Sequence, residues 1–228
     1  MSLRSICAAL LLAAGTSWAA EPAEVLKRFD AAQSSVHSLS AEFVQTTTNR
    51  LLAQPIVARG KFYMTRPASL RLDYVAPERM NVVIDGDQYT GYFPNRNKVE
   101  KRDIKRWSHY IFRFFGLQAT EELAKIYDLR VEPPAAAGEG PVVVLDPKKK
   151  RLKKRIDELR FWLDAKTYLP VKVRYQKENG DAQVIEFHDL RVNPDLAANF
   201  YRVDVPSGVT VTDGFSMPAF KPTGDPAH

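Results

Sequence analysis

The stretch KFYMTRPASLRLDY, residues 61–74, contains two segments in which apolar and polar side chains alternate. Such alternation is typical of β-strands with one buried and one solvated face. Arg66 and Pro67 separate the segments, and a proline cannot donate a backbone hydrogen bond to a neighbouring strand. By parity, Arg66 would share the face of Phe62 and Met64, which is the face expected to be buried. The sequence therefore predicts two strands with an arginine at the rim of an apolar face.

Strand signals of the same kind continue along most of the chain. The segment 80–93, MNVVIDGDQYTGYF, predicts two strands around Asp85-Gly86, a dipeptide that favours a tight hairpin turn. Asn179-Gly180 predicts another hairpin in the same way. Ten or eleven strands are expected in total, mostly antiparallel because their connections are short. An amphipathic helix over 21–35 precedes these strands, and a helical insertion over 103–126 interrupts them.

The insertion 103–126 lacks strand-like alternation and is rich in aromatic residues. Gly116 is expected to end a first helix, because glycine often follows helix C-termini, and Thr120 is expected to cap a second one. The first helix is either an ordinary core helix or a cover that can move away from the sheet. Its large apolar side chains are Trp107, Tyr110, Ile111, Phe114 and Phe115.

The first residues of the chain are typical of a secretory signal peptide. Arg4 precedes an apolar run over 6–14, and Ser17 and Ala19 follow at the spacing of a cleavage site. We therefore expect a signal peptide over 1–19 and a periplasmic protein. The only cysteine, Cys7, lies within it, so the mature chain would hold no disulfide and no cysteine-based zinc site.

The remaining length, roughly 210 residues, suits one domain of barrel or sandwich size. We expect that domain to cover residues 20–215. Its last strand, with a turn, is expected within YRVDVPSGVTV, residues 201–211. The Pro-rich segment 216–228 is expected to form a disordered tail.

The formal net charge of +6 depends on one short run, KKKRLKKR. An exported protein rarely meets nucleic acid, so no nucleic-acid partner is expected. A membrane surface that carries anionic lipids, or another partner, is the expected contact of this run. The alternative is a solvated hairpin tip without a partner. The charged residues are Lys148, Lys149, Lys150, Arg151, Lys153, Lys154 and Arg155.

Signals for catalysis are weak. His37, His109 and His188 lie far apart in the sequence and have no metal-ligand spacing. Neither a G-x-S-x-G motif nor a glycine-rich phosphate loop is present. We expect no enzyme and no cofactor, although a lipid hydrolase whose triad is assembled by folding stays open as an alternative.

The order of these elements resembles the LolA-type periplasmic carriers of outer-membrane lipoproteins over nearly the whole mature chain. The resemblance implies an incomplete antiparallel β-barrel, or half-barrel, with a helical lid over an apolar cavity. It implies a monomer that accepts the acyl chains of lipoproteins from an inner-membrane transporter and delivers them to an outer-membrane receptor without catalysis. The segments that carry the resemblance are SLSAEFVQT, the strand that ends in RP, VIDGDQYTGYFPN, the aromatic insertion, LDAKTYLPVKV, the NG hairpin and VPSGVTV.

The resemblance also implies roles for single residues. Arg66 matches the arginine that holds the lid of the empty carrier closed, and its alternative is an exposed arginine at a strand end. Leu70 departs from the family, which often has an aromatic residue there, and the basic run is unusual for it. The basic run therefore leaves a specialised carrier of another envelope lipid open, and a lipid- or lipoprotein-sensing regulator is a further alternative. Residues expected to line the cavity are Phe43, Phe62, Met64, Leu70, Leu72, Trp107, Ile111 and Phe115.

Overall fold

The computed structural model describes residues 21–106, 108–115, 118–197 and 199–217. The predicted signal peptide, 1–19, lies outside these residues, and so does the part of the predicted tail that follows residue 217. Among the described residues, none of the helices is both long and apolar enough to cross a membrane.

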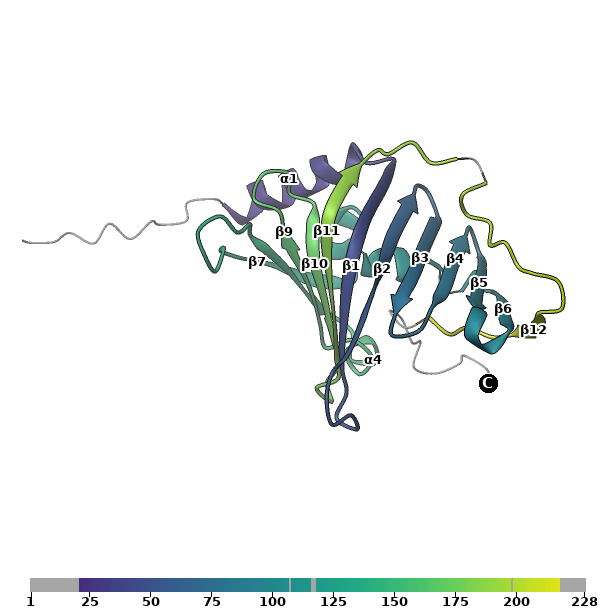
Figure 1. The fold of residues 1–228 in the computed structure, drawn as a ribbon. Helices are drawn as coiled ribbons and strands as arrows, with labels where there is room; N and C mark the ends of the chain where they lie inside the picture. Colours follow the sequence, from purple (N-terminus) through teal and green to yellow (C-terminus); the bar gives the residue numbers. More distant parts are fainter. Residues whose placement is uncertain (1–20, 107, 116–117, 198, 218–228) are drawn as a thin grey trace, which may run out of the picture.

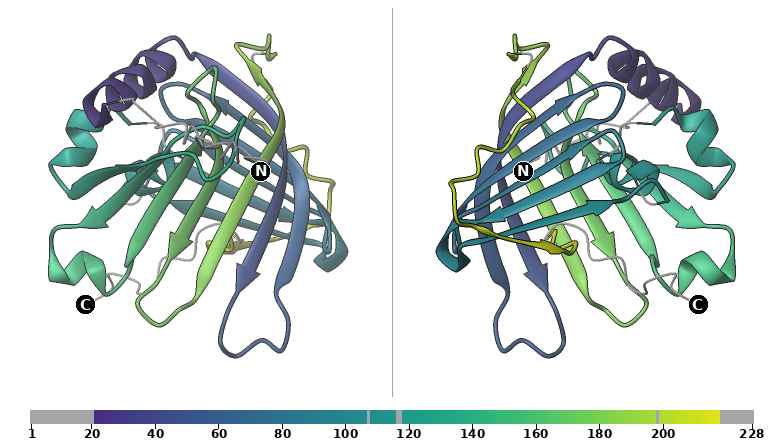
Figure 2. Two further views of the ribbon diagram at one scale, coloured as in Figure 1. Left: turned by 90° about the vertical axis from the view of Figure 1, so that its left-hand side faces the viewer. Right: turned by 90° about the vertical axis from the view of Figure 1, so that its right-hand side faces the viewer.

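Twelve strands form one sheet in the order β12-β6-β5-β4-β3-β2-β1-β11-β10-β9-β8-β7. Neighbours are antiparallel except β12, which runs parallel to β6. The sheet curls around one face without closing, which confirms the predicted half-barrel (Figures 1 and 2). The strands are β1 (Ser38–Thr48), β2 (Ile56–Thr65), β3 (Ser69–Ala76), β4 (Met80–Asp85), β5 (Gln88–Phe93), β6 (Lys98–Asp103), β7 (Tyr127–Glu132), β8 (Val142–Pro147), β9 (Glu158–Leu163), β10 (Pro170–Gln176), β11 (Ala182–Val192) and β12 (Thr210–Asp213).

Short helices accompany the sheet. The first confirms the helix predicted over 21–35, and it buries Val25, Phe29 and Gln33, which lie on one face because they are four residues apart. The ring of Phe29 stacks on Phe161 of β9 with centroids 6.2 Å apart, so this helix is attached to the sheet. The helices are α1 (Pro22–Ser34), the 3-10 helix η1 (Pro94–Arg96), α2 (Ser108–Phe114), α3 (Thr120–Ala124) and α4 (Lys150–Lys153).

The sheet and the helices share one hydrophobic core. Phe62 of β2 lies at its centre, with its ring centroid 5.2 Å from Phe115 and 5.0 Å from Phe187. Phe115 directly follows α2, so these rings join the helical insertion to the middle of the sheet. A curved sheet and helices on one face can bury a common core in this way.

Both predicted hairpins are present. The β4–β5 turn contains Gly86 with φ +58°, and the β10–β11 turn contains Gly180 with φ +87°. Glycine adopts such left-handed backbone conformations at little cost in free energy because it has no side chain. The local turn chemistry therefore fixed where these strands begin and end.

The helical insertion differs from its prediction. Thr120 is not a cap: α3 begins at Thr120, and Ala119 occupies the capping position. The Thr120 backbone N–H donates to an Asp30 carboxylate oxygen over 2.8 Å, and its hydroxyl donates to the other oxygen. The prediction failed because the partner of Thr120 lies on α1, far away in the sequence. Trp107 and Gly116 lie outside the described residues.

The C-terminal segment also differs. Of the last strand expected within 201–211, only Thr210 and Val211 belong to a strand, β12, and the residues before it cross β2 and β3, where the ring of Phe200 lies 4.6 Å from that of Tyr63. Arg71 holds this crossing by donating to the Phe200 carbonyl over 2.7 Å. Ser216 and Met217 do not belong to a disordered tail, because Met217 is fully buried and the Tyr89 hydroxyl donates to the Ser216 carbonyl over 2.9 Å.

Candidate functional site

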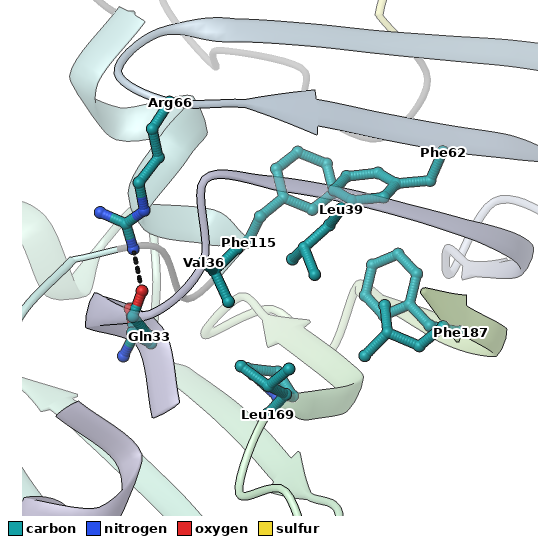
Figure 3. Close-up of a pocket in the computed structure, with 10 residues that line it drawn as sticks. Gln33, Val36, Leu39, Phe62, Arg66, Phe115, Leu169 and Phe187 are labelled. Atoms are coloured by element: carbon teal, nitrogen blue, oxygen red, sulfur yellow. Dashed lines mark hydrogen bonds between the residues drawn. The ribbon is translucent and has the colours of Figure 1, made fainter. Parts of the chain in front are cut away.

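An apolar pocket lies between the C-terminal end of α1 and the inner face of the sheet (Figure 3). Its walls come from α1 and the turn after it, from β1, β2 and β11, from the residue after α2 and from the β9–β10 turn. The lining residues are Gln33, Val36, Leu39, Phe62, Arg66, Phe115, Leu169, Pro170, Phe187 and Leu190.

The pocket is almost filled by these side chains. Its free volume is about 20 Å³, which is room for about one water molecule. Pockets that hold small molecules usually measure about 300–1,000 Å³. This pocket is therefore too small for such a molecule in this structure, and a larger ligand can enter it only if the side chains of its wall are displaced.

Arg66 joins the sheet to α1 at the rim of the pocket. Its guanidinium Nη2 donates to the Gln33 carbonyl oxygen over 3.2 Å, and its backbone N–H donates to the His37 carbonyl over 2.8 Å. The Gln33 carbonyl lies in the last turn of α1, the negative end of the helix dipole, so a cation is favoured there. Pro67 lies in the tight turn between β2 and β3, whose last paired residues are Thr65 and Ser69.

Few polar atoms face the pocket. The side-chain amide nitrogen and oxygen of Gln33 and the Nε of Arg66 are buried, and none has a hydrogen-bond partner among the described residues. Buried polar atoms without partners are rare in proteins because each loses its hydration. The closed pocket is thus held together by apolar contacts, and the unpartnered polar atoms of Gln33 and Arg66 at its rim destabilise it.

The residues predicted to line the cavity are only partly brought together in the pocket. Phe62 and Phe115 line it. Trp107 and the side chains of Tyr110 and Phe114 lie outside the described residues. The other five are buried elsewhere in the same core, namely Phe43, Met64, Leu70, Leu72 and Ile111.

Seven of the ten residues of the pocket wall were not among the predicted site residues. Leu39 and Leu190 face it because β1 pairs with β11, and Leu169 reaches it from the β9–β10 turn. Inward alternation could have placed Leu39 on the buried face, since it shares the face of Phe43. No local signal brings the other two to α1.

The basic run forms a short helix rather than a hairpin tip. α4 lies between β8 and β9, and the half-buried Leu152 packs against the core. The Lys148 ammonium donates to the Ala124 carbonyl over 2.5 Å and lies 3.7 Å from an Asp128 carboxylate oxygen. All seven cations of the run are exposed, and none of them lines the pocket.

Titratable groups with altered pKa values lie outside the pocket wall. Burial raises the pKa of Tyr89 and raises the pKa of Tyr175 to about 12. Hydrogen bonds from the Thr167 backbone, followed by those from Lys166, lower the pKa of Asp164. Across the described residues, no group of three or more His, Cys, Asp or Glu side chains is placed to hold a metal ion.

Comparisons with known proteins give a family and a fold. The profile of the outer membrane lipoprotein carrier protein LolA matches residues 34–204. No curated protein matches the chain. An uncharacterized conserved protein from Thermus thermophilus is similar in structure, with TM-score 0.53 and 14% identity, covering 84% of this chain and 98% of that one.

Two further solved structures are more distant. A LolA superfamily protein from Nitrosomonas europaea has TM-score 0.41 and 11% identity, covering 81% of this chain and 99% of that one. MucB in the MucA/MucB complex of Pseudomonas aeruginosa has TM-score 0.45 and 17% identity, covering 79% of this chain and 60% of that one.

Proposed function

Because this chain belongs to the family of the outer membrane lipoprotein carrier protein LolA, we propose that it carries acyl chains of lipoproteins between its sheet and its helices. One observation supports this function above the others. An almost filled apolar pocket is closed at its rim by the hydrogen bond from Arg66 to the end of α1. The apolar contacts between these side chains can be replaced by contacts with an apolar ligand.

A cavity that its own side chains fill in the empty protein can lower the net binding free energy of acyl chains. Each buried methylene contributes about 0.8 kcal/mol, so several long acyl chains would bind too tightly to be released. Entry of the chains separates Phe115 from Phe62 and Phe187, and the lost apolar contacts offset part of this gain. The Arg66 bond adds about 1–2 kcal/mol to the closed form. The balance allows both uptake and release.

The proposed route follows the family. The carrier acts as a monomer in the periplasm, receives its cargo from an inner-membrane transporter and hands it to an outer-membrane receptor. It performs no chemical step. Acylated lipoproteins are the proposed cargo, and the acyl chains occupy the space now filled by the pocket side chains.

The substitution Arg66→Leu tests the role of the rim contact. We expect the variant to load acyl cargo but to release it poorly, because the closed form loses its hydrogen bond to Gln33. Native mass spectrometry of the purified protein measures loading, and transfer of a labelled lipoprotein to acceptor membranes measures release. We expect more lipid-bound protein and roughly five- to thirtyfold slower transfer, since about 1–2 kcal/mol is removed from the closed state.

Arg191→Leu is the matched control, because Arg191 is exposed on β11 near the same end of the sheet. It should load and release as the original protein does. Absence of acyl species in every preparation would contradict the carrier function. Normal transfer by Arg66→Leu would contradict the role of the rim contact alone.

A further inference from the structure

The β1–β2 hairpin projects from the sheet at the end away from α1 (Figure 1). β11 begins at Ala182, opposite Thr48, and β3 ends at Ala76, opposite Arg59. Residues 49–55 therefore extend past the strands on both sides, and residues 56–58 of β2 extend past β3. Beyond Ala58, which is buried, the hairpin has no outer strand on the β3 side that could cover its side chains.

The projecting hairpin nevertheless carries apolar side chains. Leu51 is 93% exposed and Leu52 is 39% exposed, and Ile56 and Val57 are exposed as well. Four of the eight exposed large apolar side chains in the described part of the chain lie on this one hairpin. Exposed apolar residues that gather at one place mark an interaction site more often than scattered ones do.

The basic helix α4 lies at the same end. Strand pairing places Glu158 opposite Gln176, Gln176 opposite Ala182, and Ala182 opposite Thr48. These four residues form a row across the sheet, at the start of β9, the end of β10, the start of β11 and the end of β1. α4 directly precedes β9, so it extends from one side of the row, and the β1–β2 hairpin extends from the other.

The charge at this end is strongly positive. Seven of the eight residues from 148 to 155 are lysine or arginine, and all seven are exposed. Arg50 adds a cation at the hairpin tip. The acidic residues nearby are fewer, namely Asp128 beside Lys148, and Asp157, Glu178 and Asp181 on the adjoining turns.

We propose that this end of the molecule docks on a bilayer that contains anionic lipids. The Leu51–Leu52 tip enters the headgroup region, and the cations of α4 contact lipid phosphates. Binding at a membrane surface combines buried apolar area with attraction to anionic headgroups, and both are present here. A nucleic acid would use the cations without the leucines. The pocket lies at the opposite end, so docking does not depend on what the pocket carries and leaves α1 free for a protein partner.

Vesicle binding of the full mature chain tests the proposal. Co-sedimentation is measured with phosphatidylcholine vesicles that contain or lack phosphatidylglycerol, at low and high salt. We expect binding only to the anionic vesicles, and weaker binding at high salt. Lys150→Gln with Lys153→Gln should weaken it roughly thirtyfold, and Leu51→Ser with Leu52→Ser by about tenfold or more.

The control variant combines Lys27→Gln with Lys166→Gln, which removes the same charge from exposed positions at the α1 end. It should bind vesicles as the original protein does, and circular dichroism should show that all variants are folded. Equal binding to neutral and anionic vesicles, or none to either, would overturn the proposal. So would tighter binding to duplex DNA than to vesicles, or unchanged vesicle binding by the leucine variant.

Discussion

Gln33 is the residue at which α1, Arg66 and the pocket meet. Its backbone carbonyl accepts the Arg66 hydrogen bond, whereas its side-chain amide is buried and has no partner among the described residues. The residue as a whole is only 4% exposed. A buried amide without partners costs about 1–3 kcal/mol. The same residue therefore fastens the closed form through its backbone and destabilises it through its side chain. This keeps the closed form close in free energy to an open one.

Replacing the Gln33 side chain should stabilise the closed protein. Gln33→Leu keeps the backbone carbonyl and removes the buried amide, so we expect the free energy of unfolding to rise by about 1 kcal/mol. Urea denaturation of the empty protein measures the change. The control is Gln45→Leu, because Gln45 is equally buried but accepts a hydrogen bond from the Tyr74 hydroxyl over 3.0 Å. That variant should lose stability, and a loss of similar size in Gln33→Leu would contradict our interpretation of the amide.

Among the connecting elements, the β9–β10 turn has a direct effect on the pocket. The Asp164 carboxylate accepts hydrogen bonds from the backbone N–H groups of Lys166 and Thr167 over 3.0 and 2.7 Å. These bonds fix the turn, and the next residues, Leu169 and Pro170, line the pocket. The same bonds lower the pKa of Asp164 from its ordinary value of 3.8.

The turn should make stability depend on pH. The folded pKa of Asp164 is lowered, so its contribution is present above pH 3.8 and is lost as the pH falls through the folded pKa. At pH 7 we expect the free energy of unfolding of Asp164→Asn to be about 1 kcal/mol lower than that of the original protein. The two proteins should become equally stable at low pH, where Asp164 is protonated. Thermal melts from pH 7 to pH 2.5 measure it. Lys166→Ala is the control, and a difference that is constant across this range would contradict the role of the carboxylate.

The elements that the sequence predicted correctly are those with local causes. Gly86 and Gly180 lie in turns whose backbone needs them, and the α1 stripe repeats every four residues. Thr120 was misassigned because its partner, Asp30, is on another helix. The buried Met217 was also missed, because its neighbour Ser216 bonds to Tyr89 on β5, which is distant in the sequence.

At the scale of the whole molecule, the position of Arg66 at the rim could be predicted because a polar residue interrupts an alternating strand next to a proline, whereas its contact with a helix was implied only by the resemblance to the carrier family. The small size of the pocket could not. It depends on how Phe62, Phe115 and Phe187 fit together after three separate segments have paired. The projecting hairpin also follows from long-range pairing, since only the ends of β3 and β11 show how far residues 49–58 extend.

Removing the Phe115 ring from its contact with Phe62 and Phe187 should lower the stability of the empty protein and raise its affinity for acyl chains. Phe115→Ala deletes a side chain that fills the pocket, so the empty protein should lose about 3–5 kcal/mol of unfolding free energy. An acyl chain no longer has to displace this ring, so a fatty acid should bind at least tenfold more tightly and should restore much of the lost stability. Calorimetric titration and melts with and without myristate measure both effects. Ile84→Ala, a fully buried change outside the pocket wall, should lower stability without raising affinity. Equal affinities in the two variants would show that the pocket side chains do not compete with the cargo.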